Sequence, residues 1–230
     1  MSVLLKEDTG FAHFIAANTK LIAPPHVPEI RLHLAEESLP IWQKTEDELG
    51  EMNVPPPFWA FAWAGGQALA RYLLDHPHEV AGKPVLDLGT GSGLVAIAAM
   101  KAGAASVLAA DIDRMALAAV RLNAEANAVS VAATSDDLLS DSPGAFGTIL
   151  VGDLFYERDL AERVMTFIAT AEQAGARVLV GDPARSYFPR DAFVQLAVYE
   201  VPVTRELEDA LVKKTAVWAR RPKTGGKPEG

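Results

Sequence analysis

Residues 85–93 read Val-Leu-Asp-Leu-Gly-Thr-Gly-Ser-Gly, an apolar strand pattern that runs directly into three alternate glycines and then into an apolar helical pattern. Glycines are needed where a backbone turns tightly and where a ligand lies against it without interference from a Cβ atom. A plain strand-to-helix turn is the alternative, but three glycines at alternate positions are costly without a ligand. The stretch therefore predicts a ligand-binding loop that joins a buried strand to a helix.

The spacing of these glycines narrows the ligand. A dinucleotide fingerprint would need a glycine at the sixth position of the loop, where the chain has Leu94, and the Gly-Lys-Ser/Thr of a P-loop is absent. Nothing in the loop is arranged for a pyrophosphate. S-Adenosylmethionine has no phosphate, and its carboxylate suits the amides at a helix N-terminus. We expect this cofactor to contact Asp87, Gly89, Thr90, Gly91 and Gly93.

The sequence on either side of the loop alternates between short apolar runs and helical patterns. Alternation of this kind predicts a parallel sheet covered by helices on both faces. The expected helices span residues 67–74, 94–102, 114–127 and 157–173. The expected strands span residues 85–88, 107–110, 129–132, 148–151 and 178–180, followed by 193–203 and 211–220. No convincing helix separates the last two runs, so they form a hairpin with one antiparallel terminal strand.

These patterns predict an α/β fold with a Rossmann-like, seven-stranded, mostly parallel sheet of the class I methyltransferase type. We expect the catalytic domain to span residues 58–220, and residues 221–230 to be a disordered tail. Residues 1–57 form an N-terminal extension that ends in three prolines. It carries a helix around residues 10–19, capped by Asp8 or Thr9, and a short strand at 30–34. The extension is either an arm that grips the substrate or a cap on the sheet.

Composition excludes several classes of function. The 230-residue chain is 50% hydrophobic and carries a formal net charge of −9, which argues against a phosphate-tracking nucleic-acid surface. It has no cysteine, so disulfides, thiolate metal sites and cysteine nucleophiles are ruled out. The five histidines show no metal-ligand spacing, and we expect no metal. No apolar run has membrane-spanning length and no targeting segment is recognisable, so the expected compartment is the cytoplasm.

Acidic residues follow the second and third expected strands. Asp111 comes about 20 residues after the glycine loop, where a carboxylate accepts hydrogen bonds from ribose hydroxyls. We expect Asp113 to cap the next helix and Asp111 to bind the ribose. In the alternative interpretation Asp113 is still the cap, but Asp111 is merely solvated. Either Asp136 or Asp137 can accept from the adenine amine, although a solvated pair is the competing interpretation. We place Ile112 and Asp136 among the cofactor-binding residues.

The fourth expected strand ends in Gly152-Asp-Leu-Phe-Tyr156. Ligands of doubly wound sheets gather at the carboxyl ends of strands, so Gly152 is expected at the cofactor, with Asp153 and Tyr156 facing the transferable methyl group. Amide methyltransferases place Asn/Asp-Pro-Pro-Tyr/Phe here, whereas a carboxylate suits a lysine ammonium. The alternative is that Asp153 caps the helix near Glu157 while Tyr156 lies in the core.

An aromatic run precedes the first helix of the catalytic domain, at Phe58-Trp-Ala-Phe-Ala-Trp-Ala-Gly-Gly66. We expect Trp63 to lie against the cofactor, because Gly65 and Gly66 let the chain pass close to it. Trp59 and Phe61 are divided between the core and a substrate channel, and Phe155 is expected on the same apolar rim. Such a rim favours the uncharged form of an amine nucleophile.

Taken together, residues 57–74, 85–93, 110–113 and 152–156 and the Gly181-Asp-Pro183 stretch resemble the electron transfer flavoprotein β-subunit lysine methyltransferases. These belong to the class I protein lysine methyltransferases with an Asp-x-x-Tyr motif. The resemblance extends to Asn18-Thr19 and residues 28–31, and so covers most of residues 10–220. Trp-Ala-Gly-Gly-Gln and Gly-Asp-Pro are its most specific parts.

The resemblance implies ε-N-methylation of lysines on the β subunit of electron transfer flavoprotein. It implies that Asp153 and Tyr156 lie at the catalytic end and that Trp63, Gly89, Gly91 and Asp111 bind the cofactor. A bacterial-type cytoplasmic member is expected, because no mitochondrial targeting segment is recognised; the tail beyond Arg220 matches nothing in the family. The alternatives are a lysine methyltransferase for ribosomal protein L11, a small-molecule N-methyltransferase, and a non-catalytic module that only binds a partner.

Overall fold

The computed structural model describes residues 2–35, 56–203 and 211–221. Within them, seven strands form one sheet in the order β5-β4-β3-β6-β7-β9-β8. The strands are β3 (Pro84–Leu88), β4 (Ser106–Ala110), β5 (Ala132–Thr134), β6 (Thr148–Gly152), β7 (Arg177–Asp182), β8 (Phe193–Pro202) and β9 (Val212–Arg220). β3 to β7 pair in parallel, and β9 lies antiparallel between β7 and β8. The predicted mostly parallel sheet with an antiparallel terminal hairpin is confirmed.

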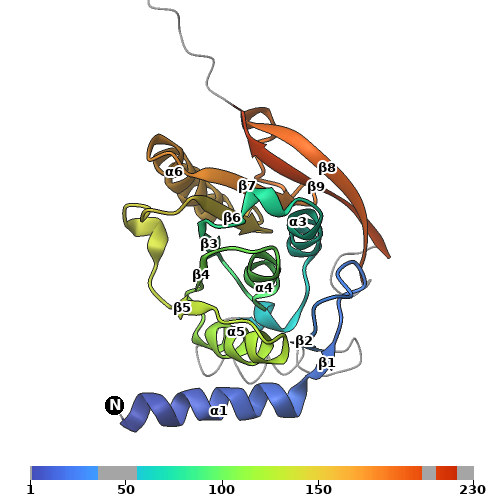
Figure 1. Ribbon diagram of the computed structural model, residues 1–230, viewed down its shortest axis with the longest axis vertical. Helices are drawn as coiled ribbons and strands as arrows, with labels where there is room; N and C mark the ends of the chain where they lie inside the picture. Colours follow the sequence, from blue (N-terminus) through green and yellow to red (C-terminus); the bar gives the residue numbers. More distant parts are fainter. Residues whose placement is uncertain (1, 36–55, 204–210, 222–230) are drawn as a thin grey trace, which may run out of the picture.

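The central strands are buried on both faces, which explains their continuous apolar sequences. Helices α3 (Ala64–Asp75), α4 (Leu94–Lys101) and α5 (Arg114–Ala126) lie on one side of the sheet, and α6 (Arg158–Gln173) lies on the other (Figure 1). The side chains of α3 and α4 pack with Leu150 and Leu179 of the sheet. The α6 side chains pack with Ile149 and Val151, which point to the opposite face. The carboxyl ends of the parallel strands are thus held on a rigid support.

The described part of the N-terminal extension packs beside α5. Its helix α1 (Ser2–Asn18) lies along α5 (Figure 1), and β1 (Lys20–Ile22) pairs antiparallel with β2 (Leu32–Leu34). Two asparagine side chains, one on α5 and one just after it, accept hydrogen bonds from this segment. Asn123 accepts from the His33 amide at 2.7 Å, and Asn127 accepts from the Arg31 amide at 3.0 Å. The predicted helix start is wrong, because α1 begins at Ser2 and residues 8 and 9 lie inside it. Residues 36–55, which precede the predicted boundary at 57, lie outside the described residues.

One predicted strand is displaced. The pattern at residues 129–132 predicts a strand there, but β5 begins only at Ala132. The backbone amide of Val129 donates to the Ala124 carbonyl at the end of α5, and its side chain packs against the N-terminal extension. This valine therefore closes the helix rather than starting the strand. No helix in the described residues is both long and apolar enough to cross a bilayer. The expected disordered tail, beyond residue 221, is also outside the described residues.

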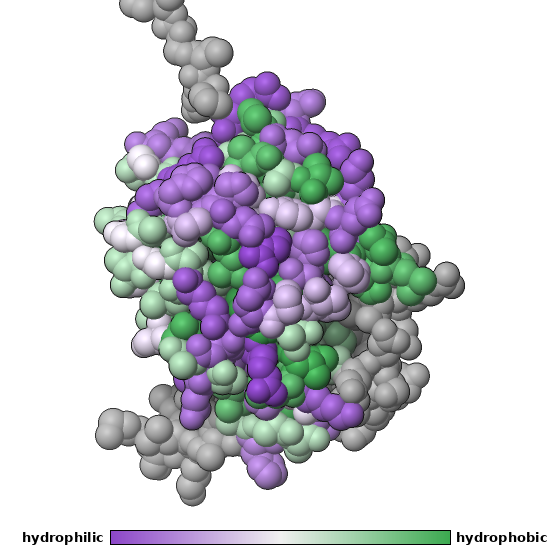
Figure 2. All heavy atoms as spheres, turned by 45° about the vertical axis from the view of Figure 1, so that its right-hand side comes forward, coloured by the Kyte–Doolittle hydropathy of each residue, from purple (hydrophilic) through white to green (hydrophobic). Residues whose placement is uncertain are grey.

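The hairpin of β8 and β9 forms one edge of the sheet. Its exposed face carries apolar side chains, namely those of Val194, Leu196, Val198, Leu211 and Val212. Figure 2 brings this side of the molecule forward and shows apolar clusters set among polar side chains. The other face of β8 is covered, because Ala197 and Tyr199 pack against the cluster that contains α3.

Candidate functional site

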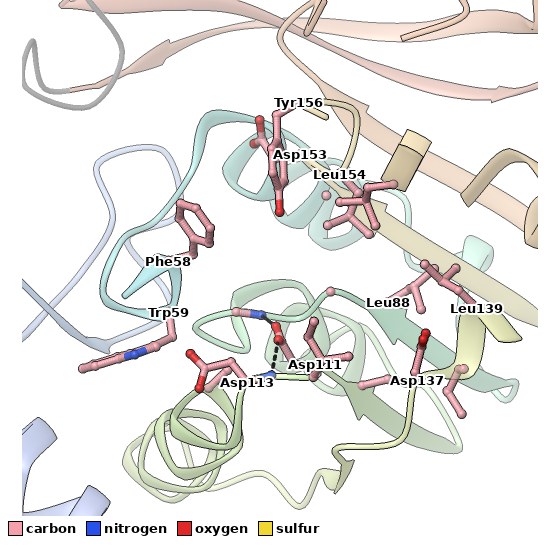
Figure 3. Close-up of a pocket in the computed structure, with 18 of the residues that line it drawn as sticks. Phe58, Trp59, Leu88, Asp111, Asp113, Asp137, Leu139, Asp153, Leu154 and Tyr156 are labelled. Carbon is pink, nitrogen blue, oxygen red and sulfur yellow. Dashed lines mark hydrogen bonds between the residues drawn. The ribbon is translucent and has the colours of Figure 1, made fainter. Parts of the chain in front are cut away.

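A cavity of about 500 Å³ opens at the carboxyl ends of β3, β4 and β6 (Figure 3). Its size is within the usual range for small-molecule sites. Five aspartates line it, namely Asp111, Asp113, Asp136, Asp137 and Asp153. Its other lining residues include Phe58, Trp59, Trp63, Gly89, Gly91, Ile112, Gly152, Leu154, Tyr156, Arg163 and Arg185. The structure thus brings most of the predicted site residues together, although they come from distant parts of the chain.

The glycine loop forms the floor of the cavity. Gly89 and Gly91 line it, with φ angles of 65° and 52° that a residue with a Cβ atom rarely adopts. Behind the loop, Asp87 is 1% exposed and accepts hydrogen bonds from the Thr90 hydroxyl at 2.6 Å and the Ala96 amide at 3.0 Å. Burial raises the pKa of Asp87 to about 7. Asp87 and Thr90 therefore shape the loop from beneath, and neither lines the cavity. Gly93 lies beside them, as the residue before α4, and packs against α5.

Asp111 joins β4 to the glycine loop. Its carboxylate accepts from the Gly91 amide at 2.9 Å and from the Asp113 amide at 3.0 Å. Burial raises the pKa of Asp111, against the effect of these two donors. Asp113 accepts from the Met115 amide and so caps α5, as predicted. Between them, the Ile112 side chain is 71% exposed at the cavity wall. Asp111 is therefore fixed to the loop and is not merely solvated.

The two aspartates after β5 differ in their partners. The Asp137 carboxylate forms an ion pair with Arg163 at 2.5 Å, and this hydrogen bond lowers the pKa of Asp137. The Asp136 carboxylate instead accepts a hydrogen bond from the Thr134 hydroxyl at 2.6 Å. Both line the cavity. Asp137 is thus engaged with α6, whereas the described contacts of Asp136 are local.

Asp153 lies at the end of β6 with a φ angle of 59°. One of its carboxylate oxygens accepts from the Gly65 amide at the start of α3, and the other accepts from the Nε and Nη2 atoms of Arg185 at 2.7 Å each. The alternative in which Asp153 caps the next helix is wrong, because Glu157 is the residue before α6 and makes no side-chain cap. Asp153 instead connects the end of β6 to the start of α3 and to Arg185.

Tyr156 is 46% exposed and lines the cavity, so the alternative that buries it in the core is also wrong. Its ring lies 5.8 Å from that of Phe58, whose ring lies 5.9 Å from that of Trp63. Burial raises the pKa of the Tyr156 hydroxyl, and the charges of Glu157 and Asp111 raise it further. Three aromatic side chains, Phe58, Trp63 and Tyr156, therefore form one rim of the cavity; we call them the aromatic rim.

The structure corrects the predicted substrate channel. Phe155 is completely buried and packs edge-on against Phe188, and Phe61 packs with α5 and the N-terminal helix. Neither lines the cavity. Trp59 contributes to the wall, but it is 1% exposed and its ring points away from the cavity (Figure 3). Phe58 and Trp63, at the two ends of the aromatic run, reach the cavity, whereas the rings of Trp59 and Phe61 between them fill the core.

Among the cavity residues that the sequence analysis did not predict, Phe58 and Arg185 contact predicted site residues. Phe58 opens the aromatic run and was available as a candidate, but its position at the rim depends on the turn that follows it. Arg185 lies two residues after the Gly-Asp-Pro stretch, and its guanidinium reaches both Asp153 and the ring of Trp63, which is 5.8 Å away. Within the described residues, no group of three or more His, Cys, Asp or Glu side chains is arranged to hold a metal ion.

Comparisons with known proteins agree with this geometry. A family model described as "Ribosomal protein L11 methyltransferase (PrmA)" matches residues 68–153, from within α3 to just after β6. The chain is 37% identical to the electron transfer flavoprotein beta subunit lysine methyltransferase of Rattus norvegicus over 222 residues, which cover 94% of this chain and 86% of the rat protein. It is 32% identical to the ribosomal protein L11 methyltransferase of Geobacter metallireducens over 172 residues, which cover 74% of this chain and 56% of that protein.

A solved structure supports the fold. The magnesium protoporphyrin IX methyltransferase of Synechocystis, solved with bound SAM, matches with a TM-score of 0.50 at 13% identity. The match covers 68% of this chain and 78% of that one. At this identity the likeness concerns the arrangement of helices and strands alone.

Proposed function

The chain belongs to the electron transfer flavoprotein β-subunit lysine methyltransferase family, and from this premise we propose that it methylates lysine side chains of that β subunit. It is an S-adenosylmethionine-dependent methyltransferase. The observation that carries the proposal for lysine is the Asp153–Tyr156 corner, which shares one cavity with the glycine loop and Asp111. The compartment, which the sequence analysis expects to be the cytoplasm, stays a prediction.

The cavity suits a cationic nucleoside without phosphates. Its two arginines in the described residues, Arg163 and Arg185, are both paired with aspartates, so neither is spare for a pyrophosphate. Five carboxylates line the cavity and outnumber these two arginines, and their negative potential favours a sulfonium and an ammonium. Amides at the N-terminus of α4 are suited to the carboxylate of the methionine end.

We assign the cofactor contacts from this lining. Asp111 accepts from the ribose hydroxyls, and Ile112 packs against the adenine. Asp136 is the better acceptor for the adenine amine, because Asp137 is engaged with Arg163. Gly89, Gly91 and Gly152 let the ligand approach the backbone, and Trp63 closes the methionine end. Asp87, Thr90 and Gly93 act indirectly, through the shape of the loop.

The transfer places demands on Asp153 and Tyr156 that their positions meet. When bound, S-adenosylmethionine supplies a sulfonium methyl group, whose carbon forms a bond to the uncharged lysine nitrogen as the C–S bond breaks with its electron pair on sulfur. Beforehand the lysine ammonium loses one proton to water. Asp153 attracts the ammonium and orients the amine, since a carboxylate oxygen already bonded once can accept again. The aromatic rim excludes water from the lysine side chain, and alignment supplies much of the rate.

Labelled cofactor and purified electron transfer flavoprotein β subunit provide the test. We expect radioactive methyl groups on lysines of the β subunit, located by mass spectrometry, and none when Asp153→Ala replaces the wild type. Binding of the cofactor without any lysine label would contradict the proposal. Binding of NAD in place of S-adenosylmethionine would contradict the assignment of the cavity.

A second candidate substrate has its own support. The family model for ribosomal protein L11 methyltransferases matches residues 68–153, which contain the glycine loop and Asp153. Those residues define the cofactor half of the site, so the match bears on methyl transfer more than on substrate choice. Ribosomal protein L11, a free amine and nicotinamide therefore belong in the same assay. Label on any of them would change the assigned substrate.

A further inference from the structure

The proposed function leaves a question about charge at Asp153. A lysine side chain is a nucleophile only when uncharged, yet its unperturbed pKa is about 10.4. The cavity wall is acidic, and negative charge stabilises the ammonium. The site therefore needs a feature that attracts the lysine and still lets its proton leave.

Charged and titratable groups reach this corner from each surrounding element. Two follow β4 (Asp111 and Asp113), two follow β5 (Asp136 and Asp137), and one lies on α6 (Arg163). Three follow β6 (Asp153, Tyr156 and Glu157), Asp182 is the last residue of β7, and Arg185 follows it. Arg163 is held 2.5 Å from Asp137 and also donates to the Ser140 hydroxyl. Of the two arginines that line the cavity in the described residues, Arg185 alone is bonded to Asp153.

The backbone aims Arg185 at this carboxylate. Asp182 ends β7, is 1% exposed, and accepts from the Arg185 amide at 2.8 Å. Ala184 between them has a φ angle of 69°, so the chain turns back toward the end of β6. The guanidinium then donates twice to one oxygen of Asp153 and lies over the Trp63 ring at 5.8 Å. The turn at Ala184, with its uncommon backbone conformation, thus positions Arg185 to contact Asp153.

We propose that Arg185 is a positioning residue for methyl transfer, which neutralises Asp153 so that the substrate amine is held there as the uncharged nucleophile. This inference rests on the proposed function. Asp153, already bonded to the Gly65 amide and to Arg185, accepts an N–H of the amine through a remaining lone pair. A positive charge beside the substrate lysine disfavours its ammonium form, as it does for lysine nucleophiles placed next to another cation.

Asp182 supports this arrangement. Burial, together with the charge of Asp153, raises the pKa of Asp182 to about 7. Its Oδ2 atom is buried without a hydrogen-bond partner, as a neutral carboxyl group would tolerate better than an anion. Below pH 7 Asp182 then adds no negative charge beside Asp153, and Arg185 offsets the charge of Asp153.

The test measures single-turnover methylation of the β subunit against pH, at saturating cofactor and substrate. We expect Arg185→Gln to move the acid limb of the profile upward by about one pH unit, since one nearby charge shifts a pKa by about that much. The rate below the midpoint falls about tenfold, because one unit changes the uncharged fraction tenfold. Arg185→Lys keeps the charge and should keep the wild-type midpoint. Calorimetric affinity for S-adenosylmethionine should stay within twofold in both variants.

Arg220→Gln is the matched control. Arg220 is similarly buried, pairs with Glu172 at 3.0 Å and lies over the ring of Phe193, but it does not line the cavity. Its variant should follow the wild-type profile. An independent readout is NMR titration of a target peptide with ¹³C-labelled lysine, bound to the enzyme with S-adenosylhomocysteine. The pKa of the bound lysine should lie below that of the free peptide and rise in Arg185→Gln.

Several outcomes would overturn the inference. A wild-type pH profile in Arg185→Gln, or an equal midpoint shift in Arg185→Lys and Arg185→Gln, shows that the charge of Arg185 has no such effect. Weakened cofactor affinity with an unchanged midpoint assigns Arg185 to the cofactor instead. Should Arg185→Gln fail to fold, Arg185→Lys and the NMR titration of the wild type still decide, because a bound lysine pKa at or above the free value refutes the proposal. If the wild type labels no lysine at all, the proposed function fails and the inference falls with it.

Discussion

At the amino ends of β3, β6 and β7 a buried carboxylate is surrounded by donors, whereas at the carboxyl ends of the same strands the aspartates lie near one another. Glu79 is the carboxylate at the amino end. It accepts from the Tyr72 hydroxyl at 3.1 Å and pairs with Arg177, the first residue of β7, at 3.3 Å. Its backbone carbonyl accepts from Thr148, the first residue of β6. Burial alone would raise the pKa of Glu79, but these donors outweigh it and lower the pKa.

The carboxyl end shows the opposite balance. Burial raises the pKa of Asp111, Asp113 and Asp182, to about 6 for Asp113 and about 7 for Asp182. The charge of Asp111 adds to the effect on Asp113, and that of Asp153 adds to the effect on Asp182. Raised pKa values of this kind concentrate at functional sites, because burial and like charge are kept there for the sake of a ligand. The comparison suggests that the amino end stabilises the fold and that the carboxyl end gives up stability for function.

Removing a carboxylate should therefore have different consequences at the amino and carboxyl ends of the strands. We expect the largest effect from replacement of Asp153. We expect Asp153→Ala to lower the methyl-transfer rate by about 100-fold or more, because the amine loses its alignment. Cofactor affinity in calorimetry should stay near wild type. Asp153→Asn, which keeps an acceptor for the Gly65 amide, separates loss of charge from loss of that bond. Full activity in either variant would remove Asp153 from the mechanism.

Asp111 tests the cofactor side of the same end. Asp111→Ala should weaken S-adenosylmethionine binding by about 1–3 kcal/mol, the cost of leaving ribose hydroxyls and the Gly91 amide without an acceptor. Isothermal titration calorimetry measures this directly. Asp159→Asn is the control, since this exposed carboxylate at the start of α6 does not line the cavity. Unchanged affinity in Asp111→Ala would count against its ribose role.

Glu79 tests the amino end. Glu79→Ala should lower the free energy of unfolding by about 1–2 kcal/mol, because the buried Tyr72 hydroxyl loses its acceptor. Arg177 adds little to this cost, since its side chain is 41% exposed and regains water. Urea unfolding gives the stability, and steady-state assays should give wild-type kcat and KM. Glu79→Gln, which keeps an acceptor for Tyr72, should lose less. A loss of activity without a loss of stability would reverse the comparison.

Asp182 gives the smallest effect and one that depends on pH. Its pKa is near 3.8 before folding and about 7 in the folded protein, so between these values the folded state holds a proton that the unfolded chain has lost. Stability from this group is therefore greatest at low pH and is lost as the pH rises toward 7. Asp182→Asn removes the dependence and keeps the acceptor for Arg185.

We expect the stability advantage of Asp182→Asn over wild type to grow by about 1 kcal/mol between pH 6 and pH 8, as measured by urea unfolding, because each pH unit below the folded pKa changes the stability by about 1.4 kcal/mol. Asp191→Asn, at an exposed acid of the next turn, should show no such difference. Equal stability of Asp182→Asn and wild type at pH 8 would mean that the buried carboxylate carries no cost.

The fold followed closely from the sequence where the core imposes a pattern. Strands β3, β4, β6 and β7 lie within two residues of their predicted bounds, because strands buried on both faces need continuous apolar runs. The pattern failed where one residue serves two elements. Val129 looks like the start of a strand, but it packs against the N-terminal extension, and the extension's own arrangement depends on contacts with α5 that no local pattern encodes.

The site was predictable only as far as local geometry reaches. The order Asp111, Asp113 and helix placed the helix cap correctly, since both partners are close in sequence. The partners of Asp153 lie 88 residues before it and 32 residues after it, at Gly65 and Arg185, so its ion pair could not be foreseen. Phe155 was misplaced for a related reason: its side chain is buried against Phe188, which lies 33 residues later in the sequence.

Gly65 and Gly181 touch through their backbones, where α3 begins against β7. A methyl group on either residue would collide with the carbonyl oxygen of the other, and neither peptide is free to retreat. This contact ties the segment that carries Phe58 and Trp63 to the sheet itself. Anyone who redesigns the enzyme for a bulkier amine must therefore leave these two positions as glycine and gain room elsewhere, for example with a smaller side chain in place of Phe58, which is 38% exposed at the edge of the cavity.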